Sequence, residues 1–459
     1  MRKNQKMLIF PHIKIKIIDF SNYQINITME RKINKSLLEW KEKERRLPLI
    51  LNGARQVGKT YILRKFGEEQ FNHTVYVNLE TDGRVRSLFE EDLSPEKIIA
   101  QIELLTSNKV TFGKTLLFLD EIQACERALT MLKSFAEHIP ELHIVTAGSL
   151  FGVALNRERY SFPVGYVDEL SMYPLDFEEF LWAMEKKQLA DNIRDHFASD
   201  EPFTNAYHEE ALEQYRNYLV IGGMPSAINA YLEHKSLLEV ADPQQRILNE
   251  YVADMAKYAQ PPTSVKIRAC YNSIPTQLAK ENKKFQYKVV QKGGTATIFG
   301  ESIDWLQFAG LVLKCQKVEH GFLPISVYSD FSDFKLYMSD VGLLTRKSEM
   351  PASLLTSPLP QDNTFMGGIA ENYVAQALTA NQRSLYYWKN ENRGELDFVV
   401  QIDSKVIPVE VKKGSHTKAK SMDMFRKKYN CETAIRISTH HFGMANGIKS
   451  VPLYAVFCI

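Results

Sequence analysis

Eight consecutive residues near the start of the chain combine the residue types that hold a nucleoside triphosphate. They follow the spacing G-x-x-x-x-G-K-T, after an apolar run at 48–52 and before a helical pattern at 61–66. Glycines let the backbone turn its N–H groups toward phosphate oxygens, a lysine reaches the β- and γ-phosphates, and a threonine hydroxyl coordinates Mg²⁺. The residues expected to contact ATP are Gly53, Ala54, Arg55, Gln56, Val57, Gly58, Lys59, Thr60 and Tyr61.

The alternative interpretation of this segment is a glycine-rich turn that carries a surface lysine. Such a spacing arises by chance in roughly two chains in a hundred of this length. Here a strand pattern precedes it and a helical pattern follows, which is the context that a phosphate-binding loop requires. We therefore predict an ATP site in which Lys59 is a catalytic residue and Thr60 is a metal ligand.

Two carboxylates complete this predicted site. The apolar strand pattern at 116–120 ends in Asp120, and Glu121 follows directly. Asp120 is expected to hold the Mg²⁺ shell, and Glu121 is expected to orient or deprotonate the attacking water. A strand that merely ends in surface acids is the alternative, and the phosphate-binding loop upstream makes it much less favoured.

A hydroxyl and an arginine are further candidates for contact with the γ-phosphate. The strand pattern at 143–149 places either Ser149 or Thr146 at its tip, and a simple turn role is equally compatible. Arg157 and Arg159 follow, and an arginine supplied in trans would stabilise transition-state charge. Solvated helix arginines remain the favoured interpretation of these two residues.

A second group of charged residues lies near the end of the sequence. Alternation along a strand at 395–400 would place Glu395 and Asp397 on one face and Leu396, Phe398 and Val400 on the other. A tight turn at 403–404 leads to a strand at 407–412. The hairpin would then bring together the side chains of Asp397, Glu410 and Lys412, near Glu371 on a helix expected at 368–375.

This arrangement, D…E-x-K, is typical of metal-dependent nucleases. Carboxylates hold one or two hard cations, the metal activates water, and the lysine positions the nucleophile. We expect Asp397, Glu410 and Lys412 to be catalytic, with Glu371, Asp397 and Glu410 as ligands of a second divalent site. The alternative is a hairpin with solvated alternating charge, and whether cleavage is retained stays open.

Basic residues gather in two segments that could bind a phosphate backbone. The alternative for each segment is a solvent-exposed face without a binding role. The adjacent His440 and His441 are not expected to be metal ligands, because neighbours on a strand point to opposite faces. The basic residues are Lys280, Lys283, Lys284, Lys288 and Lys292 in the first segment, and Lys412, Lys413, His416, Lys418, Lys420, Arg426, Lys427 and Lys428 in the second.

Strand and helix patterns alternate from 48 to 176, which predicts an α/β domain with a mostly parallel sheet covered by helices. Residues 177–259 are expected to be chiefly helical. In 265–345, helices precede apolar strands at 310–318 and 322–328, which suggests a winged helix. The strands expected in the first sheet are 48–53, 75–79, 116–120, 143–147 and 169–173, with helices at 95–106 and 127–138.

The expected domain organisation follows from these patterns and from a proline-containing stretch that is typical of a linker. Residues 1–28 alternate isoleucine with lysine, and we expect them to be an appendage or an over-long start before Met29, with an edge strand as the alternative. The expected units are 1–28, an ATPase domain at 29–235, a helical and winged-helix region at 236–345, a linker at 346–364 and a small α/β nuclease-like domain at 365–459.

Composition sets outer limits on function. The formal net charge of +2 over 459 residues is too small to indicate a nucleic-acid partner by itself. Five scattered cysteines without C-x-x-C pairing suggest reduced thiols and a cytoplasmic location. No apolar run approaches the ~18 residues that a membrane span needs, so no membrane association is expected.

The sequence phrases resemble a large prokaryotic family of AAA-type ATPases. Members join a phosphate-binding-loop domain to a C-terminal region similar to a winged helix plus a restriction-endonuclease-like fold, and the resemblance covers about 29–459. Beyond the loop and the nuclease-like hairpin, the matching phrases are 119–123 (LDEIQ), 161–165 (SFPVG), 173–181 (YPLDFEEFL), 222–225 (GGMP) and 335–344 (KLYMSDVGLL). The resemblance implies architecture and ATP chemistry.

Three functions follow, in order of preference. The first is an ATPase that couples nucleotide state to DNA binding or metal-dependent DNA cleavage. The second is an ATP/ADP-controlled switch whose C-terminal domain binds DNA or a protein without cleaving, with nucleotide-dependent homo-oligomerisation as one outcome. The third and weakest is a metabolic phosphotransferase, for which the sequence shows no small-substrate feature.

Overall fold

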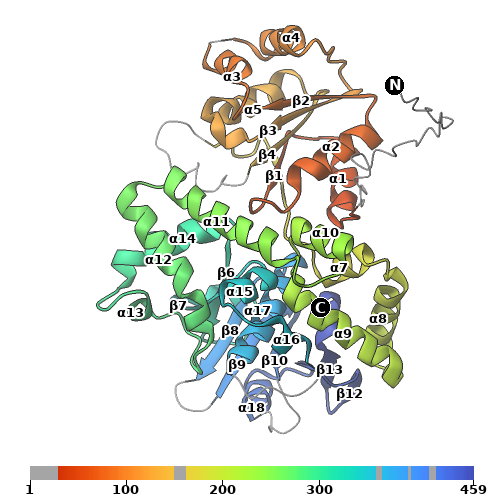
Figure 1. The fold of residues 1–459 in the computed structure, drawn as a ribbon, viewed down its shortest axis with the longest axis vertical. Coiled ribbons are helices and arrows are strands. Elements are labelled where there is room, and N and C mark those ends of the chain that lie inside the picture. Colours follow the sequence, from red (N-terminus) through yellow and green to blue (C-terminus); the bar gives the residue numbers. More distant parts are fainter. Residues whose placement is uncertain (1–28, 92, 149–161, 358–363, 391–393, 413–419) are drawn as a thin grey trace, which may run out of the picture.

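Two sheets joined by a layer of helices make up the computed structural model (Figure 1). It describes residues 29–91, 93–148, 162–357, 364–390, 394–412 and 420–459. The expectations for 1–28, for Ser149, Arg157 and Arg159, and for the basic residues of 413–418 lie outside the described residues.

The first sheet is parallel and has the strand order β2-β3-β4-β1-β5. All six positions of β3 and of β4 are buried, as expected for strands covered on both faces. This confirms the five strands and the α/β class predicted from the sequence. The strands are β1 (Leu49–Asn52), β2 (His73–Asn78), β3 (Thr115–Asp120), β4 (His143–Gly148) and β5 (Asp168–Ser171).

Helices cover both faces of this sheet. The face that includes Leu49 and Leu51 packs in the core that contains α1 and α2, and the face that includes Ile50 packs against the other three helices. Both expected helices, at 95–106 and 127–138, are present. The bounds are α1 (Ile33–Lys41), α2 (Lys59–Gln70), α3 (Gly83–Glu90), α4 (Pro95–Thr106) and α5 (Glu126–His138), with a short 3-10 turn, η2 (Ile122–Ala124).

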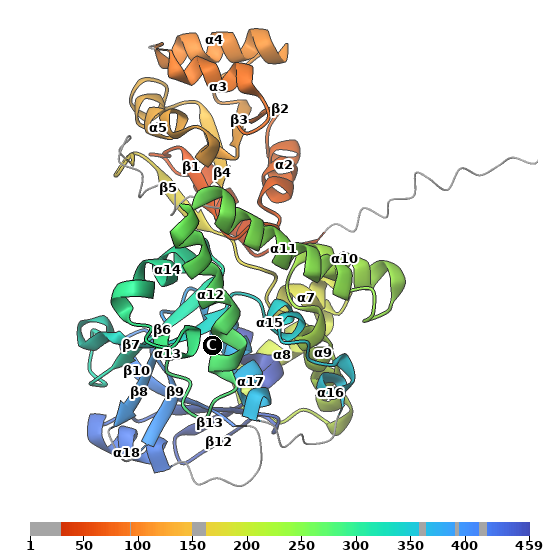
Figure 2. The ribbon, with the colours of Figure 1, turned by 60° about the vertical axis from the view of Figure 1, so that its left-hand side comes forward.

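The middle of the chain is helical, as predicted. One helix of this layer, α11, runs along the junction between the upper and lower parts of the molecule (Figures 1 and 2). The helices are α7 (Phe177–Ala183), α8 (Lys187–Ser199), α9 (Asn205–Ile221), α10 (Pro225–His234), α11 (Ala241–Tyr258), α12 (Pro261–Leu278), α13 (Tyr287–Val290) and α14 (Ala296–Phe308).

The second sheet is mixed and has the order β12-β13-β11-β10-β9-β8-β6-β7. Strands β6 and β7, from the region expected to be a winged helix, form a hairpin whose β6 also pairs with β8. The two C-terminal regions therefore share one sheet. Its strands are β6 (Val312–Val318), β7 (Ser329–Met338), β8 (Tyr386–Asn390), β9 (Gly394–Ile402), β10 (Lys405–Val411), β11 (Ala434–Ser438), β12 (Gly443–Ala445) and β13 (Ile448–Pro452).

Two element predictions in this half are wrong. The strand expected at 322–328 is instead a connection that ends in the 3-10 turn η3 (Ile325–Tyr328), and part of the expected linker forms α16 (Ala352–Thr356), which packs against α9. The remaining helices are α15 (Val341–Lys347), α17 (Thr364–Ala380) and α18 (Lys420–Tyr429), with a last 3-10 segment, η4 (Leu453–Cys458).

A close backbone contact fixes α10 against the second half of the chain. A Cβ atom on Gly222, at φ +73°, would lie 2.4 Å from Asp340 Oδ1 and 2.9 Å from Gly342 Cα. The buried Asp340 carboxylate accepts hydrogen bonds from the N–H groups of Gly223 (2.6 Å) and Leu343 (2.8 Å). Two of the sequence phrases, 222–225 and 335–344, therefore meet here and set where α10 begins.

Candidate functional site

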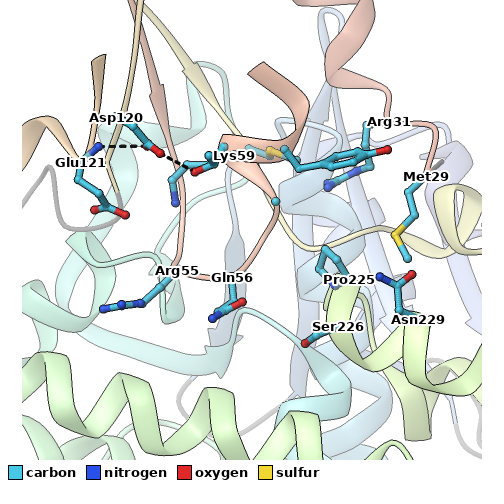
Figure 3. A pocket seen from close by; sticks show the side chains of 14 residues that line it. Met29, Arg31, Arg55, Gln56, Lys59, Asp120, Glu121, Pro225, Ser226 and Asn229 are labelled. Atoms are coloured by element: carbon cyan, nitrogen blue, oxygen red, sulfur yellow. Dashed lines mark hydrogen bonds between the residues drawn. The ribbon is translucent and has the colours of Figure 1, made fainter. Parts of the chain in front are cut away.

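A cavity of about 470 Å³ opens where the phosphate-binding loop, the end of β3 and the start of α10 meet (Figure 3). One side of it holds Asp120, Glu121 and Arg55, the other holds Met29 and Asn229, and Lys59 lies between them. The lining residues are Met29, Arg31, Arg55, Gln56, Gly58, Lys59, Thr60, Tyr61, Asp120, Glu121, Met172, Pro225, Ser226 and Asn229.

Glycine is required in the loop for two reasons. Gly53 has φ +149°, and a Cβ atom there would lie 2.2 Å from the carbonyl oxygen of Met172. Gly58 has φ +99° and precedes α2, so the helix starts at the cavity. The positive end of α2 is thereby directed at the space where phosphates would lie.

The ammonium of Lys59 is held by backbone carbonyls of its own loop. It donates to Gly53 O and Ala54 O, each at 2.8 Å, and the side chain is buried. Burial lowers the pKa of Lys59 to about 8, although Glu121 and Asp120 oppose the shift. Within the described structure, no carboxylate forms an ion pair with this lysine, so its charge is available to a phosphate.

Asp120 and Thr60 lie side by side, as predicted. Oδ2 of Asp120 accepts from Thr60 Oγ1 and from the Tyr76 hydroxyl, both at 3.0 Å, and Oδ1 accepts from the N–H of Glu121 at 3.0 Å. A hydroxyl and a carboxylate at this separation are the donors that Mg²⁺ takes in phosphate-binding-loop enzymes, so the residues present fit that ion. Tyr76, on the neighbouring β2, was not predicted.

Glu121 faces the cavity from an unusual backbone conformation. Its φ is +53°, and its carboxylate accepts a hydrogen bond from the side-chain amide of Gln123, a residue that sequence reasoning did not single out. Burial raises the pKa of Glu121, and the nearby Asp120 carboxylate adds to the rise while Gln123 and Lys59 oppose it. A carboxylate with a raised pKa at the edge of the cavity has the character of a general base.

Thr146 and Ser149 were the two candidates for a hydroxyl that contacts the γ-phosphate, and the structure describes only Thr146. Thr146 is fully buried within β4, and its hydroxyl donates to Leu49 O at 3.3 Å. Its side chain therefore belongs to the sheet interior and does not line the cavity. Ser149, the other candidate, lies outside the described residues.

Contacts distant in sequence hold the loop in place. Arg31 donates to Val57 O (3.0 Å) and Tyr173 O (2.6 Å). From α11, the Tyr251 hydroxyl donates to Arg55 O at 3.1 Å. At the turn before β6, Gly310 lies so close that a Cβ atom there would be 3.1 Å from the N of Ala54.

The C-terminal carboxylates are surrounded by lysines. Glu371, on α17, pairs with Lys283 (2.8 Å) and lies 3.7 Å from Lys335, whose ammonium also binds Glu395 at 2.7 Å. Lys389 binds the same Glu395 at 2.9 Å. Although burial opposes it, the carboxylates of Glu371, Glu395 and Asp397 raise the pKa of the buried Lys335 above its usual range.

The hairpin places Asp397 on β9 and Glu410 on the adjacent β10, with Lys412 directly after the end of β10. Glu410 forms an ion pair with Lys412, and its Oε2 is buried without a hydrogen-bond partner among the described residues. Asp397 accepts the N–H of Val411 at 2.8 Å, and burial together with Glu371 raises its pKa.

The strict alternation expected for β9 is wrong. Leu396 packs with Trp388 in the cluster beneath α18, whereas Phe398 and Val400 pack in the main core. The pairing of β8 with β9 shifts register between Tyr386 and Trp388, which accounts for the change of face.

No group of three or more His, Cys, Asp or Glu side chains suited to a metal ion occurs in the parts of the chain that the structure describes. The lysines around Glu371 and Glu395 supply the positive charge that a divalent cation would bring. The role of Glu371, Asp397 and Glu410 as metal ligands stays a prediction. The ion pairs between these lysines and carboxylates do not favour it.

The basic segments are only partly free to bind phosphate. Lys283 and Lys284 point to carboxylates, with Lys284 at 2.7 Å from Asp333, whereas Lys288 and Lys292 are exposed. In the second segment, Arg426 donates to three backbone carbonyls at its own end of the sheet.

Comparisons with protein families divide the chain into three matched regions. Residues 45–181 match the family described as AAA domain. Residues 212–354 and 366–456 match two families, each described as a domain of unknown function (DUF8612 and DUF4143). A search of curated proteins found no match. No described helix is long and apolar enough to cross a membrane.

Solved structures with a distant likeness include three proteins from Pyrococcus abyssi and Aeropyrum pernix. One is the Walker-type ATPase PABY2304 of Pyrococcus abyssi, at 13% identity and TM-score 0.43, covering 70% of this chain and 96% of that one. Another is the Aeropyrum pernix ORC1 protein in complex with DNA, at 12% identity and TM-score 0.27, covering 73% and 96%. The third is the A. pernix ORC2 protein in ADPNP–ADP complexes, at 14% and 0.34, covering 70% and 87%.

Proposed function

We propose that this chain, in which an AAA-type P-loop domain precedes two C-terminal domains, binds and hydrolyses Mg²⁺·ATP and uses its nucleotide state as a switch for its C-terminal half. The observation that carries the proposal is the cavity in which Lys59, Thr60, Asp120 and Glu121 converge. Each of these side chains is of a type that phosphoryl transfer to water requires.

In the proposed reaction, Lys59 and the loop N–H groups hold the β- and γ-phosphates. Thr60 and Asp120 would hold Mg²⁺, which neutralises phosphate charge when bound. Glu121, oriented by Gln123, accepts a proton from water as the water oxygen forms its bond to the γ-phosphorus. The bond to the β–γ bridging oxygen breaks, and ADP leaves with the electron pair.

The far side of the cavity suits the base and ribose of the nucleotide. Met29, Met172 and Pro225 offer apolar surface there, and Asn229 offers an amide. The hydroxyl of Ser226 is buried without a partner among the described residues, so it has a donor and acceptor to offer a ribose.

Contacts from the second half of the chain support a switch. The start of α10 lies at the cavity and is fixed to Asp340, and Gly310 packs on the loop backbone at Ala54. A movement of the loop on nucleotide binding would therefore displace the β6–β7 hairpin and, through it, the second sheet.

The test is Mg²⁺-dependent release of phosphate from ATP by wild type and by Lys59→Ala. We expect turnover that needs Mg²⁺ and is lost in the variant. Absence of Mg²⁺-dependent turnover in the wild type, with and without DNA, would contradict the proposed hydrolysis.

DNA cleavage by the C-terminal domain is the second candidate function. The unpartnered Oε2 of Glu410, beside Asp397 on the neighbouring strand, is the observation that favours it. Plasmid and linear DNA incubated with Mg²⁺ or Mn²⁺ would distinguish the two candidates. Cleavage by wild type that Asp397→Ala removes would support a nuclease, and retention of DNA without cleavage would support a binding switch.

A further inference from the structure

Of the positively charged side chains that line the described cavity, Arg55 alone is both near the hydrolytic side and substantially exposed. Arg31 is buried, donates hydrogen bonds to two backbone carbonyls, and forms an ion pair with Glu179 in which Nε lies 3.1 Å from Oε1. Lys59 is buried against its loop. The Arg55 side chain is 40% exposed and extends toward the side of the cavity where Glu121 lies (Figure 3).

The guanidinium of Arg55 is held by two acids of α11. Nη1 donates to Asp254 Oδ1 at 2.7 Å, and Nε lies 3.5 Å from Glu250 Oε2. These acids are four residues apart and so share one face of the helix. Tyr251, between them, binds the Arg55 carbonyl, so the loop backbone is anchored independently of the guanidinium.

We propose that Arg55 is a catalytic residue that the phosphate-binding loop itself supplies, and that its guanidinium exchanges Asp254 for the γ-phosphate of bound ATP. The inference rests on the proposed ATP hydrolysis at this site. It assigns to a residue of the same chain the role for which arginines in trans were considered from the sequence.

The chemistry of the transferred group favours this exchange. Negative charge spreads over the γ-phosphate oxygens in the transition state, and the planar guanidinium can donate two parallel hydrogen bonds to them. Glu121 and Asp254 lie close enough to influence the Arg55 charge: although burial opposes it, they and Glu250 raise the pKa of Arg55. A doubly charged competitor such as a γ-phosphate can displace a single carboxylate.

The exchange has a consequence for α11. Asp254 is buried, and burial raises its pKa while Arg55 opposes the rise. Once Arg55 leaves, a buried carboxylate loses its closest cation, which is costly. Among the described residues, Lys257, one turn further on and paired with Glu80, is a second cation that lowers the pKa of Asp254. The exchange would therefore change the charge balance at the end of α11 that leads into α12.

The experiment compares steady-state hydrolysis and equilibrium binding of a fluorescent ATP analogue, using the full chain. Arg55→Ala should lower kcat by roughly 10³-fold, in the range of other arginines at this step, while the Kd for ATP changes by less than about threefold. Arg55→Lys should recover only part of the loss because lysine lacks the fork. Arg84→Ala, at an exposed arginine of α3 (73% exposed), is the matched control and should leave both values unchanged.

Asp254→Asn tests the exchange itself. With the competing charge removed, we expect ATP to bind a few-fold more tightly, and Glu250→Gln should have a smaller effect because its contact with Arg55 is longer. Thermal unfolding of each variant identifies any loss of fold. If wild type hydrolyses ATP and Arg55→Ala keeps its kcat, or loses binding and kcat equally, the inference is overturned and the proposed function stands. Asp254→Asn that binds ATP no more tightly would overturn the exchange.

Discussion

The nucleotide cavity and the C-terminal carboxylate cluster contain the same side-chain types in opposite states of pairing. Among the described residues of the cavity, Lys59 is bound only by carbonyls, and Asp120 accepts only from hydroxyl and N–H donors. In the cluster, Glu371 and Glu395 each meet two lysines. Charges left unpaired beside open space are ready for a ligand, whereas charges already paired and buried stabilise the fold around them.

The largest expected effect is the loss of ATP hydrolysis when the proton acceptor of the cavity, Glu121, is replaced. Glu121→Gln keeps the shape and the contact with Gln123 but cannot accept a proton. We expect kcat for ATP hydrolysis to fall by about 10²–10⁴-fold, with ATP binding retained. A phosphate-release assay measures kcat, and equilibrium binding measures the affinity for ATP. Glu169→Gln, which bonds to Asn52 outside the cavity, is the control; an equal loss there would show that the effect is not local.

In the C-terminal cluster, by contrast, we expect substitution of a charged residue to lower the free energy of unfolding. Lys335→Met leaves Glu371 and Glu395 without their shared, buried cation, and breaking such a pair typically costs about 3–5 kcal/mol. Urea unfolding followed by tryptophan fluorescence measures the shift of the midpoint.

A matched control for this change is available in the same cluster. Lys389→Met removes the second partner of Glu395, but Lys389 is 33% exposed, so we expect a loss below about 1 kcal/mol. If Lys335→Met were neutral or stabilising, the cluster would resemble the cavity, and the contrast between the two regions would fail.

The contrast also separates what the sequence could predict from what it could not. The strands β3 and β4 are buried at every position and rich in apolar residues, so the sheet was predictable from the sequence pattern, and the phosphate-binding loop pointed to Thr60, Asp120 and Glu121. The strand β7 was missed because its first half is polar and partly exposed.

Long-range partners carry no local pattern. The pairing of Glu371 with Lys283 joins residues 88 positions apart (371 − 283), and the anchoring of Arg55 by Asp254 joins residues 199 apart. Each partner has an ordinary sequence context, and only the folded chain brings them together. For this reason the D…E-x-K pattern predicted a hairpin that exists but not the lysines that surround it.

The pH dependence of ATP binding should report the unpaired state of Lys59. In the free protein its pKa is lowered to about 8, and phosphate binding favours the charged form. Below pH 8 the lysine is charged and affinity is full. Above pH 8 binding must take up a proton, so the Kd for ATP should rise by up to about tenfold per pH unit.

Calorimetry in buffers of different ionisation enthalpy would measure the proton uptake, and Lys59→Arg would supply the control because arginine stays charged over this range. A Kd for wild type that is constant between about pH 7 and 9.5 would mean that Lys59 is already charged and paired, as the lysines of the C-terminal cluster are.

The smallest effect is expected from divalent cations in the absence of nucleotide. Lys283, Lys335 and Lys412 already neutralise Glu371, Glu395 and Glu410, so Mg²⁺ or Mn²⁺ would have to displace an ammonium to reach them. We expect the free energy of unfolding of the Lys59→Ala variant, which lacks the lysine that the ATP site needs, to change by less than about 0.5 kcal/mol on adding either ion. A larger stabilisation that Asp397→Asn removes would place a cation between β9 and β10, and it would turn the buried, unpartnered Oε2 of Glu410 into the mark of a metal site.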